Sequence, residues 1–376
     1  MSDLVKMAGD AKCWLLDEAA PRWSMVGRTR AGLFAERMTL SGEPDASYFR
    51  TFVQARHVYS FVTIGELGWR GDWRALVTQT VDLLLRRARR ADGFFVHKLD
   101  ADGSAIDPRA DLYDQAFVLF ALGTAGKALM RKDWIDAAES LLDRIEAEWT
   151  HPSGGFREGE IGTVLPRRQN PHMHLLEAFL ALSEASGRGR FADAAQSIAN
   201  LASNRFIDQE TGALLEYFTD ELGPAPGNEG RIAEPGHCFE WAWLFERIAA
   251  MGWTVGADAS DRLVQFARSC GIDAGRGVAI NEILTNGAVH DARARLWPQT
   301  ERLKAAIARY KRLGTSVEKR EAADAALGLR KYFDVPKPGL WRDKLDENGT
   351  WIHEMSPGSS LYHISCAYRE LIETVG

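Results

Sequence analysis

The stretch DGFFVHK at residues 92–98 decides the fold, because its pattern returns at nearly even intervals along the chain. In each copy a Gly precedes an apolar pair or near-pair, in a short polar setting between helical stretches. The copies are AGLFAE (31–36), DGFFVHK (92–98), GGFRE (154–158), TGALLEY (211–217), RGVAINE (276–282) and PGLWRDK (338–344). Their glycines are 61, 62, 57, 65 and 62 residues apart. A period this long indicates a helical array or a closed toroid of repeated units.

Three copies are followed by a second turn signal, which is typical of a short β-hairpin. These signals are DADG (100–103), TNG (285–287) and DENG (346–349). Between the copies, apolar residues recur at helical spacing, as in Tyr113, Phe117, Phe120 and Ala121. The interval between two glycines holds two helices of about 15 residues and their connections.

Six such helix pairs predict an all-α fold, an (α/α)6 barrel whose inner helices surround a central pocket. Short β-hairpins are expected in the connecting loops at one end. No linker-like or low-complexity segment interrupts the chain, so residues 1–376 are expected to form a single domain. The alternative, an irregular helical domain, requires the near-even spacing to arise by chance.

Composition narrows the function classes. The net charge of −6 argues against nucleic acid as a partner, because nucleic-acid binding requires a basic face. The four cysteines form no C-x-x-C pair, which favours reduced thiols and a cytoplasmic protein. No signal peptide and no apolar stretch of about 20 residues is present, so no membrane partner is expected. Exposed helices of the outer ring would be compatible with a homodimer.

Three of the nine histidines stand in contexts that suggest more than a structural role. His174 lies in RRQNPHMHLLEAFLAL (167–182), where Asn170 and Pro171 mark a helix start. His174 and Glu177 share a face of this apolar helix. They either pair with each other or line a cavity.

The other two histidines each follow a Pro-Gly break, in the first turn of a helix. His237 lies in AEPGHCFEWAWLFE (233–246), and we expect Glu240, one turn on, to orient it and raise its pKa. His363 lies in HEMSPGSSLYHISCAYREL (353–371). Two histidines at equivalent helix starts fit opposite sides of one barrel mouth, a geometry suited to two-base proton transfer.

Arg56, in TFVQARHVYSF (51–61), is a cation on an aromatic and apolar helix face. A buried Arg is rare unless it is paired or bound to an anion. Either an oxyanion or a salt bridge to a neighbour such as Glu66 would explain it. Trp297 stands beside a Pro and polar residues in ARLWPQTE (294–301).

Metal, nucleotide and glycosidase motifs are weak or absent. His172-x-His174 lacks the i, i+4 geometry of helical zinc ligands, and no carboxylate–histidine cluster has metal-ligand spacing. No Gly-rich phosphate loop is found. A glycosidase is expected to use two paired carboxylates, and no convincing pair emerges from the sequence.

These segments together resemble the N-acylglucosamine 2-epimerase superfamily, which includes mannose isomerases, sulfoquinovose isomerases and cellobiose 2-epimerases. The matching segments are VQARHVYSF, LYDQAFVLFAL, NPHMHLLEAFLAL, EPGHCFEWAWL, LWPQTE and SSLYHI, which run from near residue 50 to near residue 370. The resemblance implies an (α/α)6 barrel and acid–base catalysis without metal or cofactor, with a monosaccharide as the partner molecule.

The resemblance also implies roles for single residues. His237 and His363 would be the acid–base pair, and Arg56 would bind the oxygen that becomes negative. The sugar would be held by Tyr113, Asn170, His174, Glu240 and Trp297.

The stretch before the last histidine bears on the reaction. Cellobiose 2-epimerases carry a tryptophan there, whereas residues 356–360 read SPGSS and resemble the loop of monosaccharide isomerases. We therefore expect an aldose–ketose isomerase that interconverts D-mannose and D-fructose, or D-lyxose and D-xylulose, through a cis-enediolate. The alternatives are a sugar 2-epimerase of the N-acylglucosamine or cellobiose type and a non-catalytic sugar-binding barrel.

Overall fold

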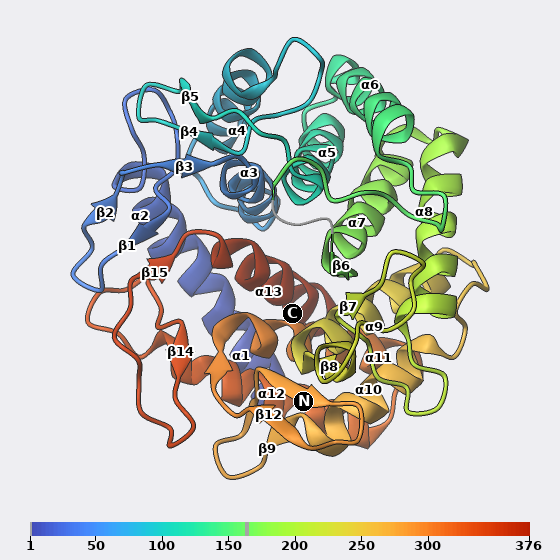
Figure 1. The fold of residues 1–376 in the computed structure, drawn as a ribbon. Coiled ribbons are helices and arrows are strands. Elements are labelled where there is room, and N and C mark those ends of the chain that lie inside the picture. Colours follow the sequence, from blue (N-terminus) through green and yellow to red (C-terminus); the bar gives the residue numbers. More distant parts are fainter. Residues whose placement is uncertain (1, 162–164) are drawn as a thin grey trace.

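Six long helices form a closed inner ring in the computed structural model, which describes residues 2–161 and 165–376. They are α3 (Thr51–Glu66), α5 (Leu112–Ala128), α7 (Asn170–Ser186), α9 (Pro235–Ala250), α11 (Leu296–Leu313) and α13 (Ser360–Val375). Each packs against the next, and α13 returns to α3 (Figure 1). Most of their residues are buried on every side, as expected of helices that line a core rather than face solvent.

The outer ring consists of amphipathic helices that cover the inner one. They are α1 (Ser2–Cys13), α2 (Ala20–Met25), α4 (Trp73–Leu83), α6 (Lys132–Trp149), α8 (Gly189–Leu201), α10 (Ala259–Cys270) and α12 (Ser316–Arg330). In α6, for example, Trp134, Ala138, Leu141 and Ile145 form one buried stripe. A π-helical segment, Trp14–Ala19, joins α1 to α2, and further π-helical turns, Leu84–Ala88 and Ala202–Phe206, extend α4 and α8.

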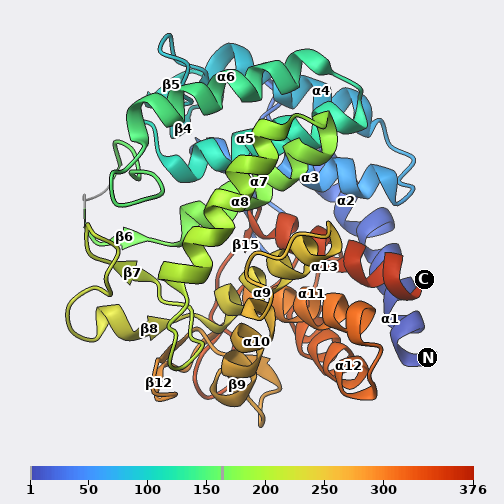
Figure 2. The same ribbon diagram turned by 90° about the vertical axis from the view of Figure 1, so that its right-hand side faces the viewer.

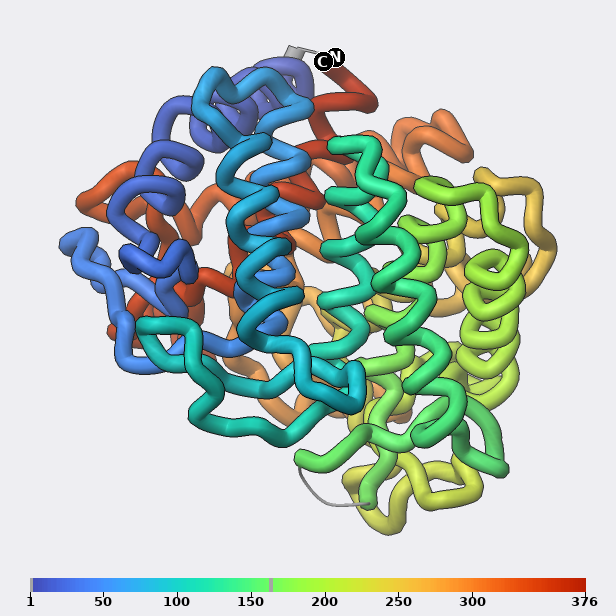
Figure 3. The backbone as a smooth tube through the Cα atoms, turned by 90° about the horizontal axis from the view of Figure 1, so that it is seen from above, coloured from blue at the N-terminus to red at the C-terminus, as the bar shows by residue number. Residues whose placement is uncertain are grey.

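The ring closes through the two ends of the chain. Helix α1 packs against α13, and seen from above the two ends of the chain lie on the same side of the barrel (Figure 3). They lie at the end of the barrel opposite the hairpins that carry β6, β7 and β8 (Figure 2).

Short antiparallel strands connect successive units at the hairpin end. The strands are β1 (Arg37–Met38), β2 (Pro44–Asp45), β3 (Phe49–Arg50), β4 (Lys98–Leu99), β5 (Ala105–Asp107), β6 (Arg167–Arg168), β7 (Tyr217–Phe218), β8 (Ile232–Ala233), β9 (Ile272–Asp273), β10 (Val278–Ala279), β11 (Glu282–Leu284), β12 (Val289–Asp291), β13 (Ala294–Arg295), β14 (Lys344–Leu345) and β15 (Ser356–Pro357). The strand before an inner helix pairs with the hairpin of the following unit, as in β3–β4, β6–β7, β8–β11, β13–β14 and β15–β1. Before α5, a single bridge from Asp111 to Gly159 makes the same connection.

A side-chain clamp fixes several hairpins to the inner helices. Gln115 accepts a hydrogen bond from the backbone N–H of Phe95 (2.8 Å) and donates one to its carbonyl (2.9 Å). Gln54 clamps Phe34 and Gln299 clamps Ala279 in the same way, each 20 residues after its partner. Each clamped residue is the second after a repeated glycine. The repeated motif is therefore the part of each unit that docks onto the barrel wall.

This architecture confirms the predicted (α/α)6 barrel with hairpins at one end. The three turn signals lie where the sequence predicts them: between β4 and β5, between β11 and β12, and directly after β14. Within the described residues, no helix combines the length and apolar character that a bilayer crossing requires.

The clamp predicts a stability effect. Gln115→Ala leaves the buried N–H and C=O of Phe95 unpaired, which should lower the free energy of unfolding by about 2–3 kcal/mol. Gln265→Ala, on the exposed face of α10, is the matched control and should change it by less than about 0.5 kcal/mol. Urea denaturation followed by circular dichroism measures both. Equal effects would mean that the clamp adds nothing to stability.

Candidate active site

A pocket of about 250 Å³ opens at the hairpin end, where the first turns of all six inner helices converge. It is lined by Arg50, Phe52, Arg56, Tyr113, Asn170, His174, Glu234, His237, Glu240, Arg295, Trp297, Ser359 and His363. All eight residues predicted from the sequence are in this set. The structure therefore brings together residues that lie up to about 300 positions apart in the chain.

A buried glutamate orients His237. Nδ1 of His237 lies 3.0 Å from each carboxylate oxygen of Glu216, which is 4% exposed. Glu216 comes from the TGALLEY hairpin. Glu240, which the sequence suggests for this role, makes no hydrogen bond to His237. The expectation is correct for the pKa of His237, which Glu240 helps to raise. It is wrong for the orientation of the ring, because Glu216 contacts Nδ1 and Asn170 contacts Nε2.

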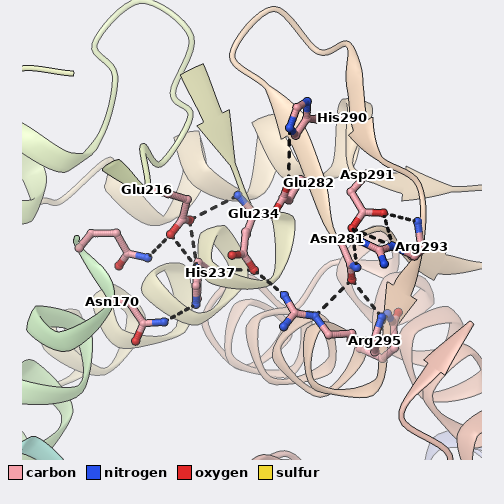
Figure 4. Close-up of polar contacts among 12 residues, drawn as sticks. Asn170, Glu216, Glu234, His237, Asn281, Glu282, His290, Asp291, Arg293 and Arg295 are labelled. Atoms are coloured by element: carbon pink, nitrogen blue, oxygen red, sulfur yellow. Dashed lines mark hydrogen bonds and ion pairs between the residues drawn. The ribbon is translucent and has the colours of Figure 1, made fainter. Parts of the chain in front are cut away.

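The second ring nitrogen of His237 faces Asn170, whose Nδ2 lies 3.0 Å from Nε2 and donates to the neutral imidazole (Figure 4). Protonation of Nε2 would require the carboxamide to turn and present Oδ1. That oxygen is buried and has no other partner. Asn170 can thus accommodate both protonation states of His237.

His363 is held in the same manner by a different glutamate. Its Nδ1 lies 2.8 Å from Oε1 of Glu301, which is fully buried. Glu301 in turn pairs with the buried ammonium of Lys304 at 2.6 Å. Nε2 of His363 has no hydrogen-bond partner among the described residues, so it is free to meet a substrate.

The two histidines differ in charge preference. Burial alone would lower the pKa of His237, but the carboxylates of Glu216 and Glu234 outweigh it and raise the pKa to about 9. Burial, with the positive charges of Arg56 and Lys304, lowers the pKa of His363 well below its usual range. Glu301 does not reverse this, because burial and Glu240 raise its own pKa. At neutral pH the site pairs an imidazolium with a neutral imidazole.

Arg56 is buried, and among the described residues no carboxylate lies within ion-pair distance of it. Its guanidinium donates to the hydroxyl of Tyr113 (2.6 Å) and to the carbonyl of Ser359 (3.3 Å), and its Nε is buried and unpaired. Four aromatic rings surround it, with centroids 4.3–5.6 Å from its central carbon. The alternative salt bridge to Glu66 is not formed, since Glu66 pairs with Arg369 at 2.8 Å. Arg56 can therefore take an anionic group from the pocket.

His174 and Glu177 fulfil both options that the sequence leaves open. Nδ1 of His174 lies 3.5 Å from Oε2 of Glu177, while His174 itself lines the pocket. Glu240 is 1% exposed, and in the part of the chain that the structure describes neither of its oxygens has a hydrogen-bond partner. A buried carboxylate of this kind is suited to accept hydrogen bonds from ligand hydroxyls.

Trp297 lies between the two histidines. Its ring centroid is 4.8 Å from that of His237 and 5.7 Å from that of His363. A flat apolar ligand face placed on this ring would meet both imidazoles.

Folding gathers carboxylates and histidines that sequence spacing does not connect. Among the described residues, three groups have ligand atoms within 4.8 Å of one another: His174–Glu177–Glu240, Glu216–Glu234–His237 and Glu240–Glu301–His363. In the last group, the ammonium of Lys304 lies 2.6 Å from Glu301 and 3.9 Å from Glu240. Lys304 thus supplies a positive charge where a metal ion would otherwise offset the two carboxylates.

Several site residues escaped the sequence analysis, namely Arg50, Glu216, Glu234, Arg295, Glu301 and Lys304. A periodic feature of the sequence could have pointed to some of these residues. The fourth residue after the repeated glycine is polar in Glu36, His97, Glu216, Asn281 and Asp343. Three of these contact the segment leading into an inner helix: Glu36 holds Arg50, Glu216 holds His237 and Asn281 contacts Arg295.

Figure 4 shows a series of polar contacts that runs from His237 to the β11–β12 hairpin. Glu234 lies 3.9 Å from His237 and 3.1 Å from Arg295, whose Nε lies 3.4 Å from Oδ1 of Asn281. Asn281 donates to Asp291 at 3.0 Å. Burial raises the pKa of Glu234 to about 7, against the opposing charge of His237.

Comparison with known proteins agrees with this architecture. Residues 32–367 match the family described as N-acylglucosamine 2-epimerase (GlcNAc 2-epimerase). The chain is 40% identical to a mannose-6-phosphate isomerase of Rhizobium meliloti (strain 1021), over 98% of this chain and 97% of that protein. It is 29% identical to a D-mannose isomerase of Pseudomonas cannabina pv. alisalensis, over 72% and 70% of the two chains.

Solved structures share the fold at lower sequence identity. A crystal structure of D-mannose isomerase superposes with a TM-score of 0.87 at 20% identity, covering 96% of both chains. Cellobiose 2-epimerase from Bacillus thermoamylovorans B4167 superposes with a TM-score of 0.88 at 16% identity, covering 98% of this chain and 99% of the other. From the family match across the barrel, we conclude that this chain belongs to the N-acylglucosamine 2-epimerase family.

Proposed function

We propose that the protein is an aldose–ketose isomerase that interconverts D-mannose and D-fructose by histidine acid–base catalysis. One observation carries the proposal: two buried glutamate–histidine pairs of opposite charge preference open onto one pocket beside an uncompensated arginine. Relatives named D-mannose isomerase and mannose-6-phosphate isomerase support this reaction class.

In the proposed reaction, neutral His363 is the base. Its Nε2 removes the proton from C2 of the open-chain aldose, and the electron pair forms the C1–C2 double bond. His237, as the imidazolium, donates its proton to the carbonyl oxygen O1, which gives a cis-enediol. His363 then returns its proton to C1 while O2 loses its proton to His237, and the ketose forms.

Arg56 stabilises the negative charge that develops on the substrate oxygens. Its buried guanidinium has an unpaired Nε and no carboxylate competing for it, so the charge meets a positioned donor in a site with little water. Glu240 and Asn170 would accept sugar hydroxyls, Tyr113 and His174 would flank the sugar, and Trp297 would stack on its apolar face.

The loop before α13 favours isomerisation over epimerisation. Its segment Ser356–Pro357 is strand β15, and the carbonyl of Ser359 accepts a hydrogen bond from Arg56. Residues 356–360 contain no aromatic side chain that could stack on a sugar. A single neutral base returns the proton on the face from which it came. Epimerisation at C2 would require a donor on the opposite face.

A second candidate substrate is the corresponding hexose 6-phosphate. Arg50 and Arg295 line the pocket with side chains that are 31% and 32% exposed, beyond the more deeply buried Arg56. Each is paired with one glutamate, Glu36 and Glu234 respectively. A relative named mannose-6-phosphate isomerase, which matches 98% of this chain, supports this second candidate.

The acid–base roles predict large losses of activity. His363→Asn and His237→Asn should each lower kcat for mannose-to-fructose conversion by about 10²–10⁴-fold, because each removes one proton-transfer group. His290→Asn, on the exposed β12 strand, is the control and should keep full activity. Product chromatography in the presence of a chelator measures all three. Activity that survives in both site variants would exclude this mechanism.

The charge of His237 predicts the pH dependence. Because its pKa is raised to about 9, kcat/KM should fall as the pH rises through about 9 and the imidazolium is lost. Glu216→Gln removes the main stabilising charge and should move this limb down by about 1–3 pH units. The control Glu229→Gln changes an exposed carboxylate away from the site. An unshifted limb in Glu216→Gln would assign the titration to another group.

The substrate question has its own test. Wild type and Arg295→Gln are assayed with mannose and with mannose 6-phosphate in deuterated water. Conversion of mannose to fructose with comparable kcat/KM in both proteins is the expected result. A preference for the phosphate ester that is lost in Arg295→Gln would establish the second candidate. Label at C2 of an epimeric aldose would identify an epimerase, and saturable binding without product would identify a sugar-binding barrel.

A further inference from the structure

A second cavity, of about 490 Å³, lies at the end of the barrel opposite the candidate active site. It is walled mainly by the C-terminal halves of α3, α5, α7, α9 and α13, whose first turns line the active-site pocket. Figure 2 shows this end on the side of the two termini, away from the hairpins. The C-terminal ends of helices carry partial negative charge, so the position favours a cation.

The charges that line this rear cavity do not balance. All three of its cations are already paired with acids, in the pairs Lys127–Glu184, Arg247–Glu184, Arg369–Glu66 and Arg369–Glu373. Two further carboxylates of the lining, Glu177 and Glu370, have no Lys or Arg within ion-pair distance in the described part of the chain. The lining of the cavity therefore carries two more carboxylates than cations.

Glu177 contributes a buried carboxylate to the lining of this cavity. It is 2% exposed, and its Oε2 accepts a short hydrogen bond from the hydroxyl of Tyr362. Its Oε1 is buried and has no hydrogen-bond partner within residues 2–161 and 165–376. Burial alone would raise the pKa of Glu177, but His174 and Lys304 outweigh it and lower the pKa, so the carboxylate is ionised. An ionised buried oxygen without a partner is costly unless a ligand or water supplies one.

The rest of the lining suits an organic cation. Glu370 accepts a hydrogen bond from Nε1 of Trp243 at 3.1 Å, and Arg247 interacts with it electrostatically without forming an ion pair. Tyr59, Phe120 and Trp243 add aromatic faces, which attract ammonium groups. The cavity is also much larger than a bare inorganic ion held by direct contacts.

We propose that the rear cavity binds a small aliphatic diamine in its doubly protonated form, with Glu177 and Glu370 as its anionic partners. Two ammonium groups match the two unpaired carboxylates. Glu177 lies on α7 one turn beyond His174, and Tyr362 directly precedes His363, so an occupant would touch the far side of the active-site wall. The inference is independent of which sugar reaction the front pocket performs.

Calorimetric titration of the full-length protein with putrescine at low ionic strength tests this site. Wild type should bind one equivalent saturably. Glu370→Gln should weaken binding about fivefold, as expected for loss of one half-exposed ion pair. Ala181→Phe, which fills the cavity without a change of charge, should abolish binding. Glu229→Gln, an equal charge change at an exposed position, should bind as wild type does.

Three outcomes would overturn the proposal. These are the absence of saturable heat, equal weakening in Glu370→Gln and Glu229→Gln, and binding that survives Ala181→Phe. Competition by equimolar potassium chloride would identify an inorganic-cation site instead. Circular dichroism of each variant separates loss of binding from loss of fold.

Discussion

Each hairpin of this barrel must satisfy its own buried backbone groups, and the rest of the structure depends on how it does so. A peptide N–H or C=O that leaves water needs a partner. Gln54, Gln115 and Gln299 meet this need by holding both groups of one hairpin residue. Elsewhere the hydroxyl of Ser356 hydrogen-bonds to the N–H and C=O of Trp341, and Nε2 of His172 accepts from the N–H of Phe156. Different side chains thus satisfy the backbone groups of different hairpins.

The clamp determines where the hairpin residues of the candidate active site lie. Because the second residue after the glycine is fixed to the barrel wall, the fourth residue is carried over the first turn of an inner helix. Glu216 reaches His237 in this way. Glu301, by contrast, projects from α11 itself toward His363. The two histidines are thus oriented by glutamates of different origin, which leaves each free to acquire its own charge environment.

The sequence predicted the fold, and it predicted which residues meet in one pocket better than it predicted the contacts between them. The spacing of the glycines and the helical periodicity sufficed for the barrel, since both are local or evenly repeated features. The eight predicted residues all line one pocket. The partner of His237 was assigned wrongly to Glu240, because a neighbour in the same helix is visible in the sequence and one 21 residues away in a hairpin is not. Lys304 was missed for a similar reason: a lysine in an amphipathic helix usually faces solvent.

The fourth position after each repeated glycine has a consequence for how the activity of such a barrel can change. The apolar and clamped residues dock each hairpin onto the barrel wall, while the side chain two places further on, as in Glu36, Glu216 and Asn281, is buried and contacts the segment that leads into an inner helix. The residue at this place differs from unit to unit: Glu36, His97, Gly159, Glu216, Asn281 and Asp343. The barrel therefore repeats one variable position around a single pocket, and a substitution at one such position can change the side chains that the pocket offers to a ligand.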